Sequence, residues 1–410
     1  KTKYASMTDD ERIKYINTTM DTYLTDGTLK QAVTDGYVLV ERTTESGVRL
    51  GIVGLIDLDD YDFDPKKKTL IRATEGTVIS RIPPRVKIRE HAAIELPHVM
   101  LLVDDPIDGQ NTDGCMEASR ENVINIGAVK HGIIEGVYAI RDTFRKLYDT
   151  DLMQGGGHIR GYAIEGEAAK QVTEAFAAKQ ESCGGFLFAV GDGNHSLATA
   201  KTCWENIKKS GKFTEEQLKT HPARQALVEI CNLHSEALEF KPIHRLLTNV
   251  DVKDMLSFFE AEITKQGLES AEGDEIVFEY VESGSCDSAK PANGNEVVSE
   301  NSAGSCTAPI KNSGINITNR GDRLPIEILQ GILDKYLETH DNVEIDYIHG
   351  DEALHGLVKE TKGCGIFLQS IDKSTLFPAI NAGGVLPRKT FSIGEANEKR
   401  YYMECHKISM

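Results

Sequence analysis

The segment Gly184–Ser196 reads GGFLFAVGDGNHS and decides how the chain is interpreted. Its first half, Gly184–Val190, is a short apolar run of the length of a buried strand. Gly191–His195 follows as a glycine-containing turn, and Ser196–Lys209 has the composition of a helix. A buried strand, a tight turn and a helix in succession are typical of α/β proteins.

Other segments extend this pattern on both sides. A helix is predicted at residues 8–35, with Thr8 and Glu11 as a capping box, and a hairpin at 37–58. Residues 96–103 are predicted as a strand, 132–149 as a helix and 251–266 as a helix. The chain ends in alternating helices and strands from residue 324 onward. These patterns predict a mixed α/β fold.

The predicted organisation has four parts. An N-terminal α/β region covers residues 1–180, and a strand-turn-helix core covers 181–281. Residues 282–320 are rich in Ser, Gly, Asn and Pro and are interpreted as a flexible insertion. A C-terminal α/β region covers 321–410.

Composition excludes several classes of function. The chain has 410 residues and a net charge of -18, which argues against binding of nucleic acid through phosphate neutralisation. Its longest apolar runs are too short for a membrane span of about 20 residues. Its eight cysteines are scattered without a C-x-x-C pair, as expected for free thiols in the cytoplasm. A small anionic ligand is still compatible with this charge, because a local basic pocket can form in an acidic protein.

The turn itself carries groups that can do chemistry. Glycines allow the backbone to bend sharply, and the first amides of the following helix can bind an anion. Asp192 can act as a base or bind a metal, and His195 can bind phosphate or transfer a proton. The same pattern also fits a simple turn in which Asn194 or Ser196 caps the helix.

Four further motifs contain potential anion ligands. One surrounds Glu75 with arginines and a threonine, and another is a triple glycine followed by a histidine and an arginine. Each also fits a structural alternative: a surface ion-pair network, a flexible loop, or a buried histidine with a hydrogen-bond partner. The candidate phosphate or substrate ligands are Arg72, Thr77, Arg81, Arg85, His158, Arg160, Asn194, His244, Arg245, Arg388 and Lys389.

The acidic run between Asp57 and Asp64 was weighed as a cation site. It lacks the glycine and the distal glutamate of an EF-hand loop. A solvated strand edge is the preferred interpretation.

Five ordered segments resemble a prokaryotic family catalogued as domain of unknown function 1015. They are LIRATEGTVISRIPPR, DTDLMQGGGHIRGY, AVGDGNHSLATAK, LHSEALEFKPIHRLL and GGVLPRKTFSIGEANEKRYY. The loop of that family usually reads Asp-Gly-His-His-Arg. Here Asp192 and His195 match it, whereas Asn194 and Ser196 do not. Members of the family usually begin with a further strand-bearing segment that has no counterpart here, so we expect some site residues to be absent from this chain.

The resemblance implies a fold and a chemistry. The family is distantly similar to the ParB/sulfiredoxin-like fold, which includes nucleotide-binding switches and kinases of free serine. It implies such a core with an additional mixed sheet and helices, and it places Asp192 and Glu75 where those kinases have their catalytic carboxylates. We therefore expect phosphoryl transfer on serine or phosphoserine, in the direction of a kinase or a phosphatase.

Several further expectations follow from the same resemblance. Glu75, Asp192 and His195 are the predicted catalytic residues. Mg²⁺ and a phosphoryl donor such as ADP, ATP or pyrophosphate are possible cofactors, and a homo-oligomer is a possible state. The alternatives are a nucleotide-binding switch without turnover and a non-catalytic scaffold for metabolic enzymes. The scaffold predicts that Glu75, Asp192 and Arg85 do not come together.

Overall fold

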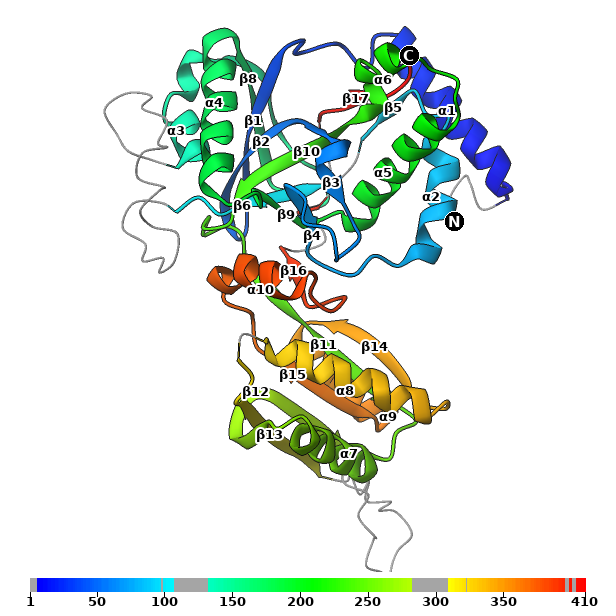
Figure 1. Cartoon of the computed structure of the whole chain (residues 1–410), viewed down its shortest axis with the longest axis vertical. Helices are drawn as coiled ribbons and strands as arrows, with labels where there is room; N and C mark the ends of the chain where they lie inside the picture. Colours follow the sequence, from blue (N-terminus) through cyan, green and yellow to red (C-terminus); the bar gives the residue numbers. More distant parts are fainter. Residues whose placement is uncertain are drawn as a thin grey trace, which may run out of the picture. The chain divides into compact units, whose positions relative to one another are not determined.

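The computed structural model describes residues 6–96, 99–106, 132–281, 309–321, 323–394, 398–399 and 403–410. Within these residues the chain forms two compact units. Unit 1 contains residues 1–241, 371–388 and 392–410, and unit 2 contains residues 242–370 and 389–391. Figure 1 labels the helices and strands of both.

Unit 1 is built on a mixed sheet of nine strands. In spatial order they are β3 (Tyr61–Asp62), β4 (Ile71–Ala73), β9 (Phe188–Asp192), β6 (Met100–Val103), β10 (Gln225–Asn232), β2 (Gly47–Asp57), β1 (Gly36–Thr44), β8 (His158–Glu165) and β7 (Arg145–Asp151). The pairs β3–β4, β4–β9 and β6–β10 are parallel, and the other neighbours are antiparallel. The carboxyl ends of β4 and β9 therefore lie at one edge of the sheet.

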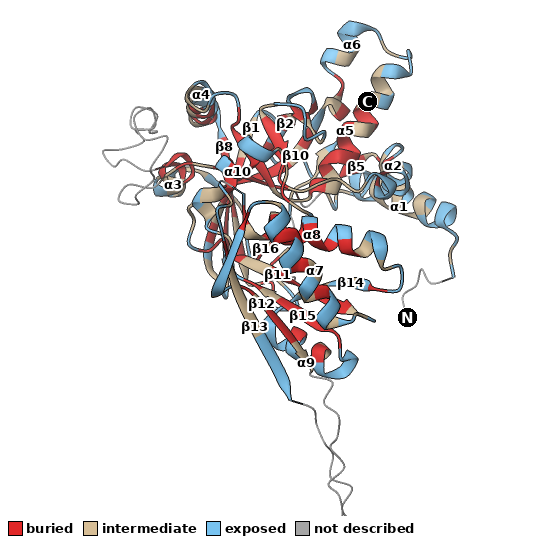
Figure 2. Cartoon of the chain, turned by 60° about the horizontal axis from the view of Figure 1, so that its bottom comes forward, coloured by how far each residue is buried: buried red, intermediate tan, exposed pale blue. Residues whose placement is uncertain are grey.

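Seven described helices belong to unit 1. They are α1 (Asp9–Thr25), α2 (Ile82–Arg89), α3 (Ile133–Ala139), α4 (Gly166–Ser182), α5 (Asn194–Lys209), α6 (Glu215–Lys219) and α10 (Leu376–Gly383). One continuous core joins strand residues such as Leu39 and Val190 to Val172 of α4 and Trp204 of α5. Figure 2 shows the buried residues on the strands and on the inner faces of these helices. A small two-stranded ribbon pairs β5 (Ile94–Glu95) with β17 (His406–Lys407).

Unit 2 has a second mixed α/β arrangement. Its sheet has the order β13 (Ile310–Thr318), β12 (Glu269–Val281), β15 (Cys364–Leu368), β11 (Phe240–Thr248) and β14 (Glu344–His349), and β16 (Phe391–Ile393) pairs with β11 outside this path. Its helices are α7 (Val252–Lys265), α8 (Pro325–Thr339) and α9 (Asp351–Thr361). Leu354 and Val358 of α9 pack on Leu246 of the sheet in a core of their own.

The prediction of a mixed α/β fold is confirmed. The strand, turn and helix around Gly191 are present, although the turn is shorter than predicted because β9 ends at Asp192 and α5 begins at Asn194. The hairpin at 37–58 forms from β1 and β2, and the capping box of Thr8 and Glu11 is present at α1.

Two predicted elements differ from the structure. The helix expected at 132–149 ends at Ala139, and Arg145–Asp151 instead forms β7, because it pairs with β8 at the edge of the sheet. The insertion expected at 282–320 lies mostly outside the described residues, but Ile310–Thr318 is a strand paired with β12. In both cases hydrogen bonds to a distant segment determine the local conformation.

The predicted part boundaries also differ from those of the compact units. A boundary near residue 180 would separate α4 from β9, yet both contribute to the same sheet and core. The units instead divide at residues 241 and 370. Local composition does not reveal this division, because the chain returns to unit 1 after completing unit 2.

Two predictions about chain chemistry can be compared with the described residues. No helix among them is long and apolar enough to cross a membrane. The five cysteines within the described part are free thiols: Cys183, Cys203, Cys231, Cys364 and Cys405.

Candidate functional site

The site begins where two parallel strands end. The register pairs Ala73 of β4 with Val190 of β9. Each chain continues for two residues beyond this pair, to Glu75 on one side and Asp192 on the other. Because neighbouring strands are about 4.8 Å apart, this register brings two acidic residues from distant parts of the sequence to the same edge.

A buried hydrogen-bond network holds the two segments together. Thr74 Oγ1 donates to the carbonyl oxygen of Val190 at 2.6 Å. The amide side chain of Asn194 accepts from the backbone N–H of Thr74 at 3.3 Å and donates to the carbonyl oxygen of Val190 at 3.3 Å. Thr74 and Asn194 are both buried, so the spacing of the two carboxylates is fixed by protein groups.

Asp192 is the most strongly constrained carboxylate of the site. Its Oδ1 accepts a hydrogen bond from the N–H of Gly193 at 2.7 Å, and its Oδ2 lies 2.9 Å from Nζ of Lys399. Lys399 also donates to Oγ of Ser392 at 3.0 Å. A cation at this distance favours the ionised carboxylate. The pair therefore places a negative and a positive group beside the first turn of α5.

Glycine is required at the turn for a geometric reason. Gly193 has φ of 87°, in the left-handed region, and it is the N-cap of α5. This conformation lets the chain leave β9 and enter α5 within one residue. The start of α5 is consequently held next to Asp192.

His195 has a defined structural role. Its Nε2 accepts a hydrogen bond from the backbone N–H of Val78 at 3.2 Å, so this nitrogen carries no proton. The contact fixes the segment between Glu75 and α2. Thr77 lies in that segment, and its hydroxyl oxygen is enclosed without a hydrogen-bond partner among the described residues.

The predicted arginines lie around this centre in different settings. Arg81 and Arg85 are exposed, and Arg85 donates to the carbonyl oxygen of Arg81 at 3.0 Å. Arg85 is on α2, which packs against α5. Arg72 lies on β4 and is largely buried. The structure thus brings Glu75, Thr77, Asp192, Asn194 and His195 together in unit 1, with the arginines on neighbouring elements.

The triple-glycine motif does not join them. His158 and Arg160 are on β8, which is five strands away from β9 in the sheet, or roughly 24 Å. His158 contacts Asp149 at 2.7 Å and Asp151 at 2.6 Å, and Arg160 pairs with Asp149 and Glu41. These carboxylates hold both cations in an ion-pair network at the sheet edge, so the prediction of a shared phosphate site is not met for them.

The second histidine motif lies in unit 2. His244 and Arg245 are on β11 and are almost completely buried. His244 accepts from the N–H of Leu368 at 3.1 Å and contacts Asp351 at 2.8 Å. Arg245 donates to Gln330 and to the carbonyl oxygen of Lys389. The internal partners satisfy both side chains, which is the structural alternative considered for this motif.

The last two predicted ligands lie where the chain passes between units. Arg388 is exposed and belongs to unit 1, whereas Lys389 is exposed and belongs to unit 2. The main chain nearby does reach the site, since the N–H of Leu386 donates to the carbonyl oxygen of Thr74 at 2.8 Å and Leu386 pairs with Glu75.

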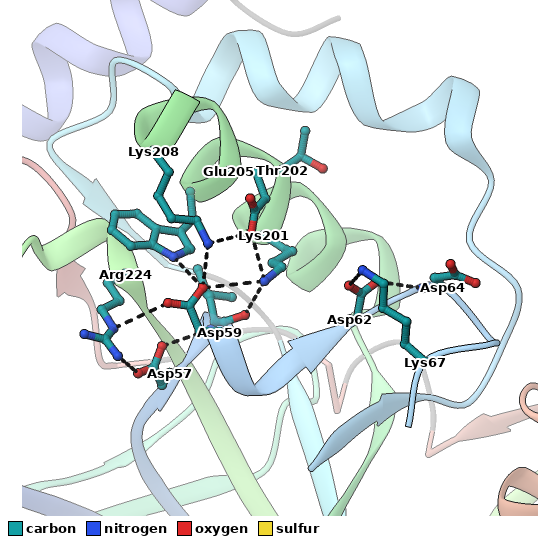
Figure 3. A network of polar contacts seen from close by, with 12 residues as sticks. Asp57, Asp59, Asp62, Asp64, Lys67, Lys201, Thr202, Glu205, Lys208 and Arg224 are labelled. Carbon is teal, nitrogen blue, oxygen red and sulfur yellow. Dashed lines mark hydrogen bonds and ion pairs between the residues drawn. The ribbon is translucent and has the colours of Figure 1, made fainter. Parts of the chain in front are cut away.

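The acidic run between Asp57 and Asp64 is neutralised by protein cations (Figure 3). Asp57 pairs with Arg224 at 2.6 Å, and Asp59 pairs with Lys208 at 2.8 Å. Within the described part of the chain, no group of three metal-ligating side chains is present. The preference against a cation site in this run agrees with these contacts.

Sequence reasoning missed Lys399. It lies far from Asp192 in the chain, inside the last of the five segments that carry the family resemblance. No spacing rule relates the two positions, because only the tertiary fold brings them into contact. The resemblance of that segment was the one available signal.

A family model described as "Protein of unknown function (DUF1015)" matches residues 1–299. No curated protein matches the chain. Among solved structures, a free serine kinase variant in complex with AMP is similar over 83% of this chain and 87% of its own, with 11% identity and a TM-score of 0.38.

Two further solved structures have comparable similarity. A conserved hypothetical protein from Pyrococcus furiosus matches over 84% of this chain and 91% of its own, with 11% identity and a TM-score of 0.36. SbnI with a C-terminal truncation, from Staphylococcus aureus, matches over 84% and 83%, with 8% identity and a TM-score of 0.35. Similarity at this level does not assign a substrate or a reaction. The family match, in contrast, covers well over half of the residues, and the protein belongs to the DUF1015 family.

Proposed function

We propose that this protein transfers a phosphoryl group to or from a small hydroxy amino acid, with serine or phosphoserine as the substrate. The observation that carries the proposal is the position of Glu75 and Asp192 at the adjoining ends of β4 and β9, with Lys399 bound to Asp192. Phosphoryl transfer depends mainly on positioning and on neutralising charge, which such a group of residues can provide.

The two carboxylates have different roles in this proposal. Both oxygens of Asp192 have partners, the N–H of Gly193 and Lys399, so Asp192 acts by keeping the ammonium group of Lys399 in place. Glu75 is the general base, as the carboxylate that the neighbouring strand supplies. Lys399 faces the negative oxygens of the transferred phosphoryl group, where a positioned cation lowers the energy of the transition state.

The bonds made and broken balance in either direction. In the kinase direction the serine hydroxyl oxygen attacks the terminal phosphorus of the donor, Glu75 accepts the hydroxyl proton, and the P–O bond to the donor breaks with its electron pair. In the hydrolytic direction water attacks the phosphorus of phosphoserine, Glu75 accepts a proton of water, and the serine oxygen leaves and is then protonated.

The choice of serine rests on the family resemblance to free-serine kinases. Neighbouring groups add anion-binding capacity, since Arg81 and Arg85 are exposed on the segment that follows Glu75. Mg²⁺ is usually held by one or two carboxylates together with substrate phosphates. Glu75 and Asp192 can supply such carboxylates, and Mg²⁺ would compete with Lys399 for Asp192.

The test is a turnover assay on the full chain. Serine is combined with ATP, ADP or pyrophosphate, and phosphoserine is assayed alone and with each acceptor, with and without Mg²⁺. Phosphoserine formation or phosphate release supports the proposal. Saturable nucleotide binding with no turnover in any combination contradicts it and favours the nucleotide-binding switch.

Substitutions assign the turnover to this site. We expect Asp192→Asn and Glu75→Gln each to lower kcat by at least about 100-fold, which is the usual contribution of a general base or a charge-stabilising group. Asn can keep the contact with the N–H of Gly193, so folding should persist. Glu90→Gln, an exposed carboxylate at the end of α2, is the matched control and should retain full activity. Full activity in Asp192→Asn would remove that residue from the mechanism.

A further inference from the structure

A cavity of about 340 Å³ lies in unit 1 next to the candidate site. One wall is the segment 62–68, and the opposite wall is the end of α10 with the following residues 383–385. The walls approach closely at Gly384, which has φ of 91° and where a Cβ atom would lie 2.9 Å from the carbonyl oxygen of Pro65. The absence of a side chain at Gly384 is therefore part of the shape of the cavity.

Arg72 lines this cavity as a buried cation with neutral partners. It donates to the carbonyl oxygen of Thr69 and to Oδ1 of Asn381, both at 3.0 Å, and its guanidinium lies 4.4 Å from the ring centre of Phe186. Burial lowers the pKa of Arg72 below its usual value, and no carboxylate among the described residues opposes this. A buried charge without a counter-charge costs free energy that a bound anion would offset.

The loop opposite Arg72 uses its acids internally (Figure 3). Asp62 accepts from the N–H of Asp64 and pairs with Nζ of Lys67 at 2.6 Å. Asp64 accepts from the N–H of Lys66 at 3.0 Å. The side chains of Lys66 and Lys68 line the same cavity, are exposed, and have no ion pair with a described residue. The lining thus has four cationic side chains and two carboxylates.

We propose that this cavity binds a diphosphate group, either on a nucleotide or as inorganic pyrophosphate. Arginine and lysine side chains are the common protein ligands of phosphate oxygens. The volume is at the lower end of small-molecule sites, and a single phosphate would leave most of it to water. The excess of positive charge selects an anion, and the volume selects one larger than orthophosphate.

The position of the cavity relates it to the carboxylates. Ala73 lines the cavity and lies two residues before Glu75. Val385 lines it too, and the next residue, Leu386, pairs with Glu75. The role of the bound diphosphate as the phosphoryl donor or product rests on the proposed function. Binding of the diphosphate in this cavity does not.

The experiment measures binding by calorimetry on the full chain, without a turnover step. Pyrophosphate, ADP, orthophosphate and adenosine are the four probes. We expect pyrophosphate and ADP to bind, orthophosphate to bind at least 10-fold more weakly, and adenosine not to bind. Tighter binding of ADP than of pyrophosphate identifies a nucleotide as the source of the diphosphate, and equal or tighter binding of pyrophosphate identifies the inorganic ion.

A double variant locates the binding. Lys66→Gln with Lys68→Gln should weaken binding of the preferred diphosphate at least 10-fold, because two cations of the cavity are lost. Lys209→Gln with Lys212→Gln removes the same charge from exposed positions outside the cavity and should change the affinity less than twofold. All four lysines are exposed, so folding should be unaffected, and circular dichroism checks this.

Two results would overturn the cavity proposal: absence of binding by both diphosphate probes at about 1 mM, or unchanged affinity in the Lys66→Gln, Lys68→Gln variant. These results are separable from failure of the proposed function. A protein that binds diphosphate in this cavity but has no turnover refutes only the proposed reaction. A protein that hydrolyses phosphoserine but binds no diphosphate refutes only the cavity proposal.

Discussion

At the scale of single residues, Asn194 shows how a departure from the family motif is accommodated. The family usually has a histidine at this position, and the asparagine here is buried at the start of α5. Its side chain bonds to the N–H and the hydroxyl of Thr74 and to the carbonyl of Val190. Asn194 therefore positions the two strand ends, and the predicted contact of Asn194 with substrate is left as a prediction.

This role predicts the effect of Asn194→Ala on stability. The substitution leaves the N–H of Thr74 buried without that partner, which should lower the free energy of unfolding by about 2–3 kcal/mol. Denaturant unfolding followed by circular dichroism measures the change. Asn206→Ala, at an exposed position of the same helix, should change it by less than about 0.5 kcal/mol. Equal effects of the two substitutions would contradict the bridging role.

At the scale of secondary-structure elements, the triple glycine belongs to the connection between β7 and β8. The N–H of Leu152 donates to the carbonyl oxygen of Gly157 at 2.7 Å, closing the hairpin. Gly157 has φ of 79°, and a Cβ atom there would lie 1.9 Å from the carbonyl oxygen of Thr43 on β1. The glycine is required by a left-handed backbone conformation and by the close approach of another strand.

Gly157→Ala should therefore destabilise the protein by more than about 2 kcal/mol, through both strain and steric overlap with backbone. Gly76→Ala is the control, because a Cβ atom at Gly76 would meet no atom within 4 Å and its φ is not in the left-handed region. Thermal unfolding of the two variants checks the difference. A Gly157→Ala protein as stable as the control would show that the hairpin adapts.

The hydrogen bond between β11 and β15 predicts a pH dependence. Burial lowers the pKa of His244 below its usual value, against the opposing effect of its bond with Asp351. His244 Nδ1 accepts from the N–H of Leu368 and can do so only while it is unprotonated. The stability that His244 supplies is thus complete above the unfolded pKa of about 6.5 and declines as the pH falls from there through the lower folded pKa.

Hydrogen exchange of β15, corrected for the intrinsic rate, measures this effect. Protection of Cys364–Leu368 should be lower at pH 5.5 than at pH 7.5 in the native sequence. In His244→Gln the protection should differ little between the two pH values, since the titrating group is gone. The same pH-dependent loss in the variant would assign the effect to another group.

At the scale of the whole molecule, each unit has its own core. Leu197 of α5 is fully buried in the core of unit 1, and Leu329 of α8 is fully buried in unit 2. Compact units with separate cores can unfold in separate transitions. We therefore expect denaturant unfolding of the chain to depart from a single two-state transition.

Two matched substitutions test this organisation. Leu197→Ala and Leu329→Ala should each lower the stability of one unit by about 2–5 kcal/mol, the usual range for a buried leucine. Hydrogen exchange with mass spectrometry assigns the loss to residues of unit 1 or unit 2. Equal loss of protection in both units from either substitution would show that they unfold together.

The sequence by itself determined the α/β class, the strand-turn-helix at Gly191 and the importance of Glu75 and Asp192. These features depend on local patterns of apolar residues, on glycine, and on short motifs that the family resemblance carries. The conversion of Arg145–Asp151 from helix to strand did not follow from local pattern, because pairing with β8 decides it.

Only the tertiary structure decided which motifs share a site. Parallel pairing of β4 with β9 brings Glu75 to Asp192, and the returning chain brings Lys399, whereas the sheet order separates His158 and the division into units assigns His244 to another core. The physical reason is that contacts between distant segments depend on strand order and register. The sequence reveals the residues that can bind an anion, and the fold selects those that can act together.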